Sequence, residues 1–147
     1  MKASFALSAF SFFHLAQALQ AGTYIIASAA LPPPLVLTEL DPAYALAFSQ
    51  QGGEPTQFWN FISTHDGYFE IQNHIESKIT CGDDVGSLCF PGDQPQAFLP
   101  EFRGGKNYEL VSESSGLFLR VNQNQDLYLA RWDQSLEEQF ILTSVDH

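Results

Sequence analysis

The titratable and nucleophilic residues of this chain are not spaced for a familiar catalytic or metal site. After the first 18 residues the histidines are His65, His74 and His147, and none has a partner at the short spacing of helical zinc ligands. No Gly-x-Ser-x-Gly sequence and no glycine-rich phosphate loop occurs. The seventeen carboxylates are so numerous that spacing alone identifies no catalytic pair. The sequence therefore predicts a protein that is not an enzyme and holds no metal or cofactor.

The two cysteines, Cys81 and Cys89, have the spacing of a bridged hairpin. The five residues Gly82-Asp83-Asp84-Val85-Gly86 between them favour a turn. A redox pair or a thiolate metal site would need a Cys-x-x-Cys spacing or further ligands, which the sequence lacks. A disulfide is therefore expected, and closing so short a loop stabilises a fold by roughly 2–3 kcal/mol.

A polar residue stands two places before a large aromatic residue at three well-separated points. The three pairs, which mark a repeated fold motif, are Gln57 with Trp59, Gln96 with Phe98, and Glu138 with Phe140. The aromatic residues lie 39 and 42 residues apart, a period typical of symmetric units that share one core. The aromatic side chains are expected in that core, and the polar ones are expected to bond buried backbone.

Short strands separated by turn residues make up the three units, which we place at about 22–63, 65–102 and 107–145. The units open on Tyr24, Phe69 and Tyr108, each two or three residues after a glycine. No apolar 3.6-residue period persists for three turns, although one helical turn is expected at 135–138. The sequence predicts a single all-β domain over residues 22–145.

Residues 1–18 have the pattern of a secretory signal peptide. Lys2 is followed by an apolar run over residues 5–13 and then by the small residues Ala16 and Ala18. The run is shorter than the roughly 20 apolar residues of a membrane span, and serine interrupts it. We expect cleavage near Ala18 or Ala21 and a secreted, extracellular protein with no membrane anchor.

Once Lys2 is removed, the chain has five basic residues against seventeen acidic ones, a formal charge of −12. Binding to nucleic acid needs lysine and arginine to displace counterions from phosphates, so nucleic acid is excluded as a partner. Anionic lipid surfaces are disfavoured for the same reason. The charge itself indicates solubility rather than a particular fold.

Three units that each open near a Gly-x-Tyr sequence and close on a Gln-x-Trp-like element resemble the ricin B-type β-trefoil lectins, including small fungal members. Gln57-Phe58-Trp59 matches the Gln-x-Trp signature in full, whereas phenylalanine replaces the tryptophan in the other two units. The start, Gly22-Thr23-Tyr24-Ile25-Ile26, is also similar to that of the fungal lectins. The resemblance implies a β-trefoil of three repeats of about 40 residues with pseudo-threefold symmetry.

The resemblance also implies where a sugar would bind. The family's stacking aromatic falls on Tyr128, twelve residues before Phe140, while its aspartate falls on Arg120 and its Asn-Gln pair on Glu137-Glu138. Trp132 is a candidate exposed aromatic nearby. The stacking position falls on Ala47 in the first unit, and the second unit offers only Phe90. Because two polar positions differ in charge, we expect a site framed by Arg120, Tyr128 and Trp132 for a sugar other than galactose, including an acidic one.

Three functions remain open from the sequence. The first is binding of a carbohydrate or glycoprotein without catalysis. The second is inhibition of a protease, because other β-trefoils insert a loop into a protease cleft and this chain has proline-braced loops at 31–34 and 50–55. The third is a trefoil without a ligand site that acts only through protein contacts.

Overall fold

Twelve strands and two single-turn 3-10 helices form the regular structure of residues 18–145, the part of the chain that the computed structural model describes. In chain order the elements are β1 (Gly22–Ser28), β2 (Leu35–Thr38), β3 (Ala47–Gln50), η1 (Pro55–Gln57), β4 (Trp59–Ser63), β5 (Phe69–Asn73), β6 (Lys78–Cys81), β7 (Cys89–Gly92), β8 (Ala97–Gly104), β9 (Asn107–Ser112), β10 (Phe118–Val121), β11 (Leu127–Ala130), η2 (Leu136–Glu138) and β12 (Phe140–Ser144). The signal peptide predicted for residues 1–18 lies outside the described residues apart from Ala18. Over residues 18–145, no helix is long and apolar enough to cross a membrane.

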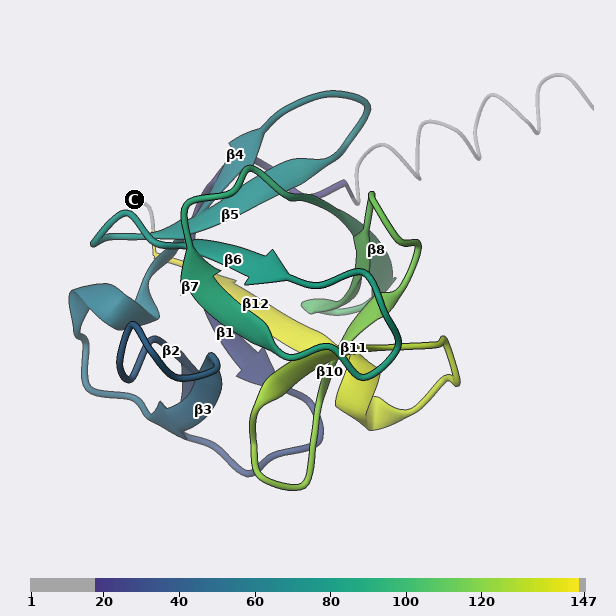
Figure 1. Cartoon of the computed structure of the whole chain (residues 1–147). Helices are drawn as coiled ribbons and strands as arrows, with labels where there is room; N and C mark the ends of the chain where they lie inside the picture. The colour runs from purple at the N-terminus through teal and green to yellow at the C-terminus, as the bar shows by residue number, and fades with distance from the viewer. Residues whose placement is uncertain (1–17, 146–147) are drawn as a thin grey trace, which may run out of the picture.

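Six of the strands close into a barrel. Pairing runs from β1 to β4, β5, β8, β9 and β12, and β12 pairs with β1 again. The other six strands form the hairpins β2–β3, β6–β7 and β10–β11. In Figure 1 these hairpins lie at lower left, in front of the centre and below the centre. Closing the ring pairs backbone groups that an open sheet would leave exposed at its edges.

The three hairpins contact one another through backbone hydrogen bonds. The N–H of Leu46 in the first unit donates to Cys89 O in the second at 2.8 Å. From the third unit, Leu127 N–H donates to Leu46 O at 2.8 Å and Leu129 N–H donates to Ser87 O at 2.9 Å. Each hairpin therefore touches both others, which gives the pseudo-threefold arrangement of a β-trefoil. The predicted fold class is confirmed.

The aromatic members of the repeated motif lie in the core. Trp59, Phe98 and Phe140 are each 0% exposed, and each is on a barrel strand. Phe140 stacks on Phe48 with ring centroids 6.0 Å apart. Full burial of one such side chain contributes roughly 1.5–3 kcal/mol, so the three rings explain why the motif recurs in every unit.

The polar members of the motif bond the backbone of their own units. Gln57 Oε1 accepts from the N–H groups of Gly52 and Gly53 at 2.8 and 3.1 Å, and its Nε2 donates to Gln50 O at 2.9 Å. Gln96 makes two 2.7 Å bonds to the N–H and the carbonyl of Cys81. These side chains satisfy backbone groups at the ends of the hairpins, as expected from the sequence.

The predicted disulfide joins Cys81 and Cys89. The two residues are direct cross-strand partners at the end of β6 and the start of β7. The bridge therefore closes the hairpin of the second unit at its turn.

Two segments depart from a simple strand pattern. Residues 44–48 are an apolar run, but the strand β3 begins only at Ala47. Tyr44 is 65% exposed and lies in a turn, where its N–H donates to Asp41 O. Pro100, a residue for which the sequence allows an edge position or an early strand end, lies within β8, which continues beside β9. Pairing between β5 and β8 stops at Phe98, so the proline occupies a stretch of β8 with a neighbour on one side only, where a missing donor is tolerated.

Candidate functional site

The candidate site begins with a cross-strand pair in the third unit. Arg120 on β10 lies directly opposite Tyr128 on β11. The neighbouring pair, Leu119 and Leu129, is buried at 1% and 0% exposure. Since successive side chains of a strand point to opposite faces, Arg120 and Tyr128 project outward from the hairpin together.

Arg120 and Tyr128 line a hollow of about 470 Å³ on the surface of the third unit. Asn122, Gln123 and Gln125 contribute amide groups from the turn between β10 and β11. The remaining four lining residues come from the loop after β1, the end of β10 and η2, and are Ala30, Leu31, Val121 and Glu137. Of the five side chains expected at the site, the hollow therefore brings together Arg120, Tyr128 and Glu137.

Arg120 is held by two carboxylates. Its Nη2 lies 2.5 Å from Glu138 Oε2 and 2.9 Å from Asp133 Oδ2, and it also donates to Arg131 O at 2.8 Å. Burial lowers the pKa of the guanidinium, but interactions with Glu138 and Tyr128 outweigh burial and raise that pKa. Arg120 is therefore a fixed cation whose charge is already compensated by protein groups.

Glu138 lies beneath the hollow rather than in it. It is 0% exposed, and besides Arg120 it accepts from the N–H of Asp133 at 3.2 Å on Oε1 and 3.1 Å on Oε2. Both of its oxygens are thus engaged within the protein. Its exposed neighbour Glu137 lines the hollow and is the carboxylate that can face a ligand.

Trp132 is not among the residues that line the hollow. It is 49% exposed in the segment between β11 and η2, beside Asp133. The pKa of Asp133 is lowered by its hydrogen bonds to Ser135 and by the charge of Arg120. The segment is thereby anchored at Asp133, while the tryptophan ring remains on the outer surface.

Several lining residues were not expected from the sequence. Ala30 and Leu31 come from the loop after β1, in the first unit, and Gln123 and Gln125 come from the turn between β10 and β11. No local signal links Leu31 to Tyr128, because they lie in different units. The alternating Asn-Gln composition of residues 122–125 was the available signal for the amides.

The other two units carry different residues at the equivalent positions. Thr38 faces Ala47 in the first unit, and Thr80 faces Phe90 in the second. The first unit therefore has no ring at the position of Tyr128. Phe90 occupies that position in the second unit and is 39% exposed.

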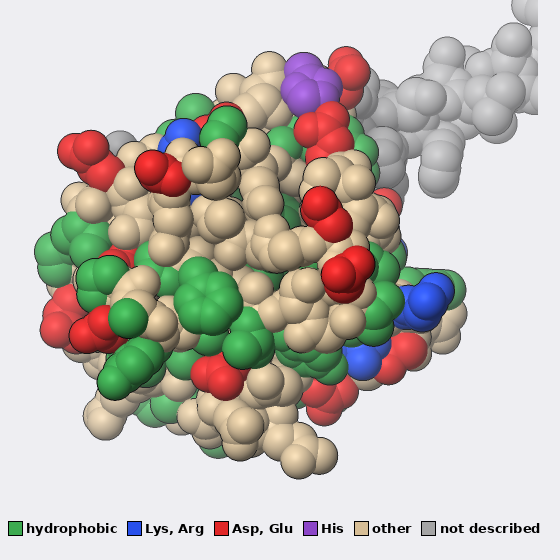
Figure 2. All heavy atoms as spheres, viewed as in Figure 1, with side chains coloured by type: hydrophobic (Ala, Val, Ile, Leu, Met, Phe, Trp, Pro, Cys, Tyr) green, Lys and Arg blue, Asp and Glu red, His purple; other side chains and the backbone are tan. Residues whose placement is uncertain are grey.

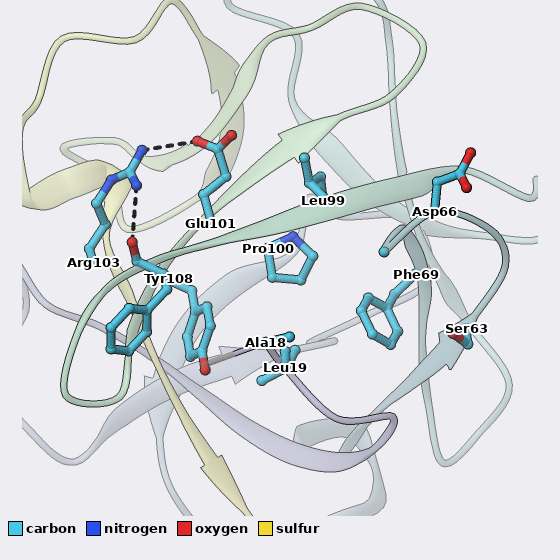
Figure 3. A pocket seen from close by; sticks show the side chains of 12 residues that line it. Ala18, Leu19, Ser63, Asp66, Phe69, Leu99, Pro100, Glu101, Arg103 and Tyr108 are labelled. Atoms are coloured by element: carbon cyan, nitrogen blue, oxygen red, sulfur yellow. Dashed lines mark hydrogen bonds and ion pairs between the residues drawn. The ribbon is translucent and has the colours of Figure 1, made fainter. Parts of the chain in front are cut away.

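A larger hollow of about 790 Å³ lies beside β5, β8 and β9. Figure 3 shows Phe69, Pro100 and Tyr108 around it, with Ala18 and Leu19 at one wall. Its cation, Arg103, is paired with Glu101 at 2.9 Å and Glu109 at 2.7 Å, and burial raises the pKa of Tyr108. One wall of this hollow consists of residues at the predicted cleavage point, whereas all residues that line the hollow of the third unit follow that point.

No group of three or more histidine, cysteine, aspartate or glutamate side chains that could hold a metal ion is found within residues 18–145.

Comparisons with known proteins support the fold. No protein-family model and no curated protein matches the sequence. Among solved structures, the designed threefold-symmetric protein ThreeFoil has a TM-score of 0.76 and 16% identity, covering 84% of this chain and 99% of that one. The ricin B-like lectin of Macrolepiota procera, in complex with lactose, has a TM-score of 0.74 and 11% identity, with coverage of 86% and 98%. An exo-β-1,3-galactanase from Clostridium thermocellum has a TM-score of 0.71 and 15% identity over 84% of this chain and 30% of that one. At these identities the matches define the class of structure: the chain is a β-trefoil of the kind found in ricin B-like lectins.

Proposed function

We propose that this protein is a secreted, lectin-like module that binds a carbohydrate in the hollow of the third unit and does not catalyse a reaction. The observation that carries the proposal is the placement of the Tyr128 ring in a hollow of about 470 Å³ lined by amide and charged side chains. That volume lies in the range of small-ligand sites. Similarity of the fold to a lectin in complex with lactose supports the choice of ligand class.

The chemistry of the lining suits a pyranose. An aromatic face offers apolar contact to the C–H side of a sugar ring, and amide side chains can both donate to and accept from hydroxyl groups. Gln123 and Gln125 supply such amides beside Tyr128. Leu31 adds an apolar wall, so that the ring and the amides face a common space.

A glycan array probed with the processed protein tests this function. Tyr128→Ala is expected to abolish binding, whereas Tyr128→Phe is expected to retain most of it because the ring is kept. Trp132→Ala is the matched control, since it removes a neighbouring exposed ring that does not line the hollow. Failure to bind any glycan at millimolar sugar would refute the proposal, and binding lost equally in Trp132→Ala would place the site elsewhere.

Secretion and the lack of catalysis have separate tests. Expression of the full chain in a secreting host should yield protein in the medium whose first residue follows Ala18 or Ala21. Glycans that bind should be recovered uncleaved after long incubation. Retention of residues 1–18 would contradict secretion by this route, and released sugar would contradict a purely binding role.

Protease inhibition is a second candidate, favoured by one observation. The loops 31–34 and 50–55 are joined by a 2.9 Å bond from Gln51 N–H to Pro34 O, and Gln57 fixes the N–H groups of Gly52 and Gly53. An exposed loop that is already fixed loses little entropy on docking. Replacing residues 50–55 with a flexible linker should abolish inhibition of a serine or cysteine protease, and Tyr128→Ala should leave it unchanged. Absence of inhibition across both protease classes would eliminate this candidate.

A further inference from the structure

Arg120 alone would make the hollow attractive to an anionic sugar, but the carboxylates around it change the charge. The carboxylates of Glu138 and Asp133 bond the guanidinium, and Glu137 is a third carboxylate among the residues that line the hollow. An acidic sugar would have to displace Asp133 from Arg120 or lie beside uncompensated carboxylates. The lining residues Arg120 and Glu137 balance in charge, but together with Glu138 beneath the hollow and Asp133 beside Arg120 the groups around the hollow are net negative, which disfavours anionic sugars.

Tyr128 and Glu137 together favour a positively charged group rather than an anion. The face of a tyrosine ring attracts cations through its quadrupole, and an exposed carboxylate attracts them through its charge. Both groups line the same hollow. Over longer distances the formal charge of −12 on the processed chain adds to the same attraction. On the face shown in Figure 2, acidic side chains are scattered widely and basic ones appear at few places.

We propose that the hollow of the third unit prefers oligosaccharides of amino sugars with a free, protonated amino group over their N-acetylated, neutral or acidic counterparts. This inference rests on the proposed function, because it names the sugar class for that same site. The ammonium group would lie between the ring of Tyr128 and the carboxylate of Glu137. Gln123 and Gln125 would remain available to the hydroxyl groups.

Calorimetry with matched short oligomers of glucosamine and N-acetylglucosamine tests the preference, at a pH of about 6 so that the free amine is protonated. The two ligands share a ring and differ in the acetyl group and in one charge per residue. An exposed ion pair with a cation–π contact predicts that the glucosamine oligomer binds about three- to tenfold more tightly. The difference should shrink in about 0.5 M salt, where charges on the surface are screened.

Two variants separate a local effect from the overall charge. Glu137→Gln should remove most of the preference for the free amine, whereas Glu76→Gln should leave it unchanged. Glu76 is an exposed turn residue of the second unit, so the two variants change the net charge equally. Equal losses in both variants would overturn the inference, because the attraction would then be non-specific.

The remaining outcomes distinguish this inference from the proposed function. If the N-acetylated oligomer binds equally well or better, and Tyr128→Ala abolishes its binding, the lectin function holds and the amino-sugar preference is wrong. Tighter binding of a sialylated or uronic oligosaccharide would also overturn the preference. If no sugar of any charge binds, both proposals fail.

Discussion

Glu138 is the polar member of the repeated motif in the third unit, and it forms a different kind of contact from its equivalents in the other two units. Its equivalents Gln57 and Gln96 bond only neutral groups, whereas Glu138 brings a negative charge into a fully buried place and pairs it with Arg120. Breaking such a pair leaves the remaining ion with fewer partners in a poorly solvated position. Because Arg120 also keeps Asp133 and Arg131 O, the loss is smaller than for an isolated pair.

Replacing Glu138 by glutamine should lower the free energy of unfolding by about 1–3 kcal/mol, since Arg120 loses its buried carboxylate. Urea denaturation followed by circular dichroism measures the change. Glu137→Gln is the matched control, because it removes the same charge from an exposed neighbour and should change stability by less than about 0.5 kcal/mol. Equal midpoints for Glu138→Gln and the wild type would show that the pair does not stabilise the fold.

At the scale of elements, the disulfide acts on one hairpin. Cys81 and Cys89 close a short loop between β6 and β7, and this hairpin contacts the other two through Cys89 O and Ser87 O. Because the disulfide restricts the loop between β6 and β7, it also stabilises the contacts that this hairpin makes with the other two.

The double variant Cys81→Ser/Cys89→Ser should lose roughly 2–3 kcal/mol of unfolding free energy, as expected for closure of a loop of this length. Urea midpoints with and without a thiol reductant provide the measurement. Reductant should shift the wild type toward the variant and leave the variant unchanged. A wild-type midpoint that does not respond to reductant, with the bridge confirmed as reduced by mass spectrometry, would contradict the expectation.

Most elements could be predicted from the sequence because the pattern that forms them is local. Alternating apolar residues and turn residues indicated the strands, and a single turn before Phe140 was expected at 135–138, where η2 lies. Tyr44 is the opposite case, because it begins an apolar run over residues 44–48 that is typical of a strand although its own backbone forms a turn. Hydrophobic pattern alone does not distinguish an apolar turn from a strand when the strand is only four residues long.

The site was less predictable because it depends on distant contacts. Alignment with the trefoil pattern located Arg120, Tyr128 and Glu137, which the hollow brings together. It did not distinguish the roles of Glu137 and Glu138, since one residue along the chain decides which carboxylate is buried. It also missed Leu31, which reaches the hollow from another unit.

For the whole molecule, the barrel makes the three units depend on one another. β1 pairs with both β4 and β12, so the first unit is bonded directly to the third, and β8 and β5 join the second unit to its neighbours. Trp59, Phe98 and Phe140 share one core cluster. No unit can separate without exposing apolar surface of the others.

Unfolding should therefore be a single cooperative transition. In a Trp132→Phe variant, Trp59 becomes the sole tryptophan and reports on the core from the first unit, while circular dichroism reports on strands of all units. The two probes should give one urea midpoint, and Phe140→Leu in the third unit should lower both equally. Separate midpoints would show that the units unfold independently.

The pairing of β1 with β12 also means that the three units could be joined in a different order along the chain. Tyr24 lies opposite Ser144, and Val145 N–H bonds Thr23 O at 3.0 Å, so the two ends of the barrel domain are neighbours. A short peptide could join them, and new ends could then be opened in the turns between β4 and β5 or between β8 and β9, at the boundaries of the units. Such circular permutants would preserve every strand pairing while moving the third unit to the start or the middle of the chain.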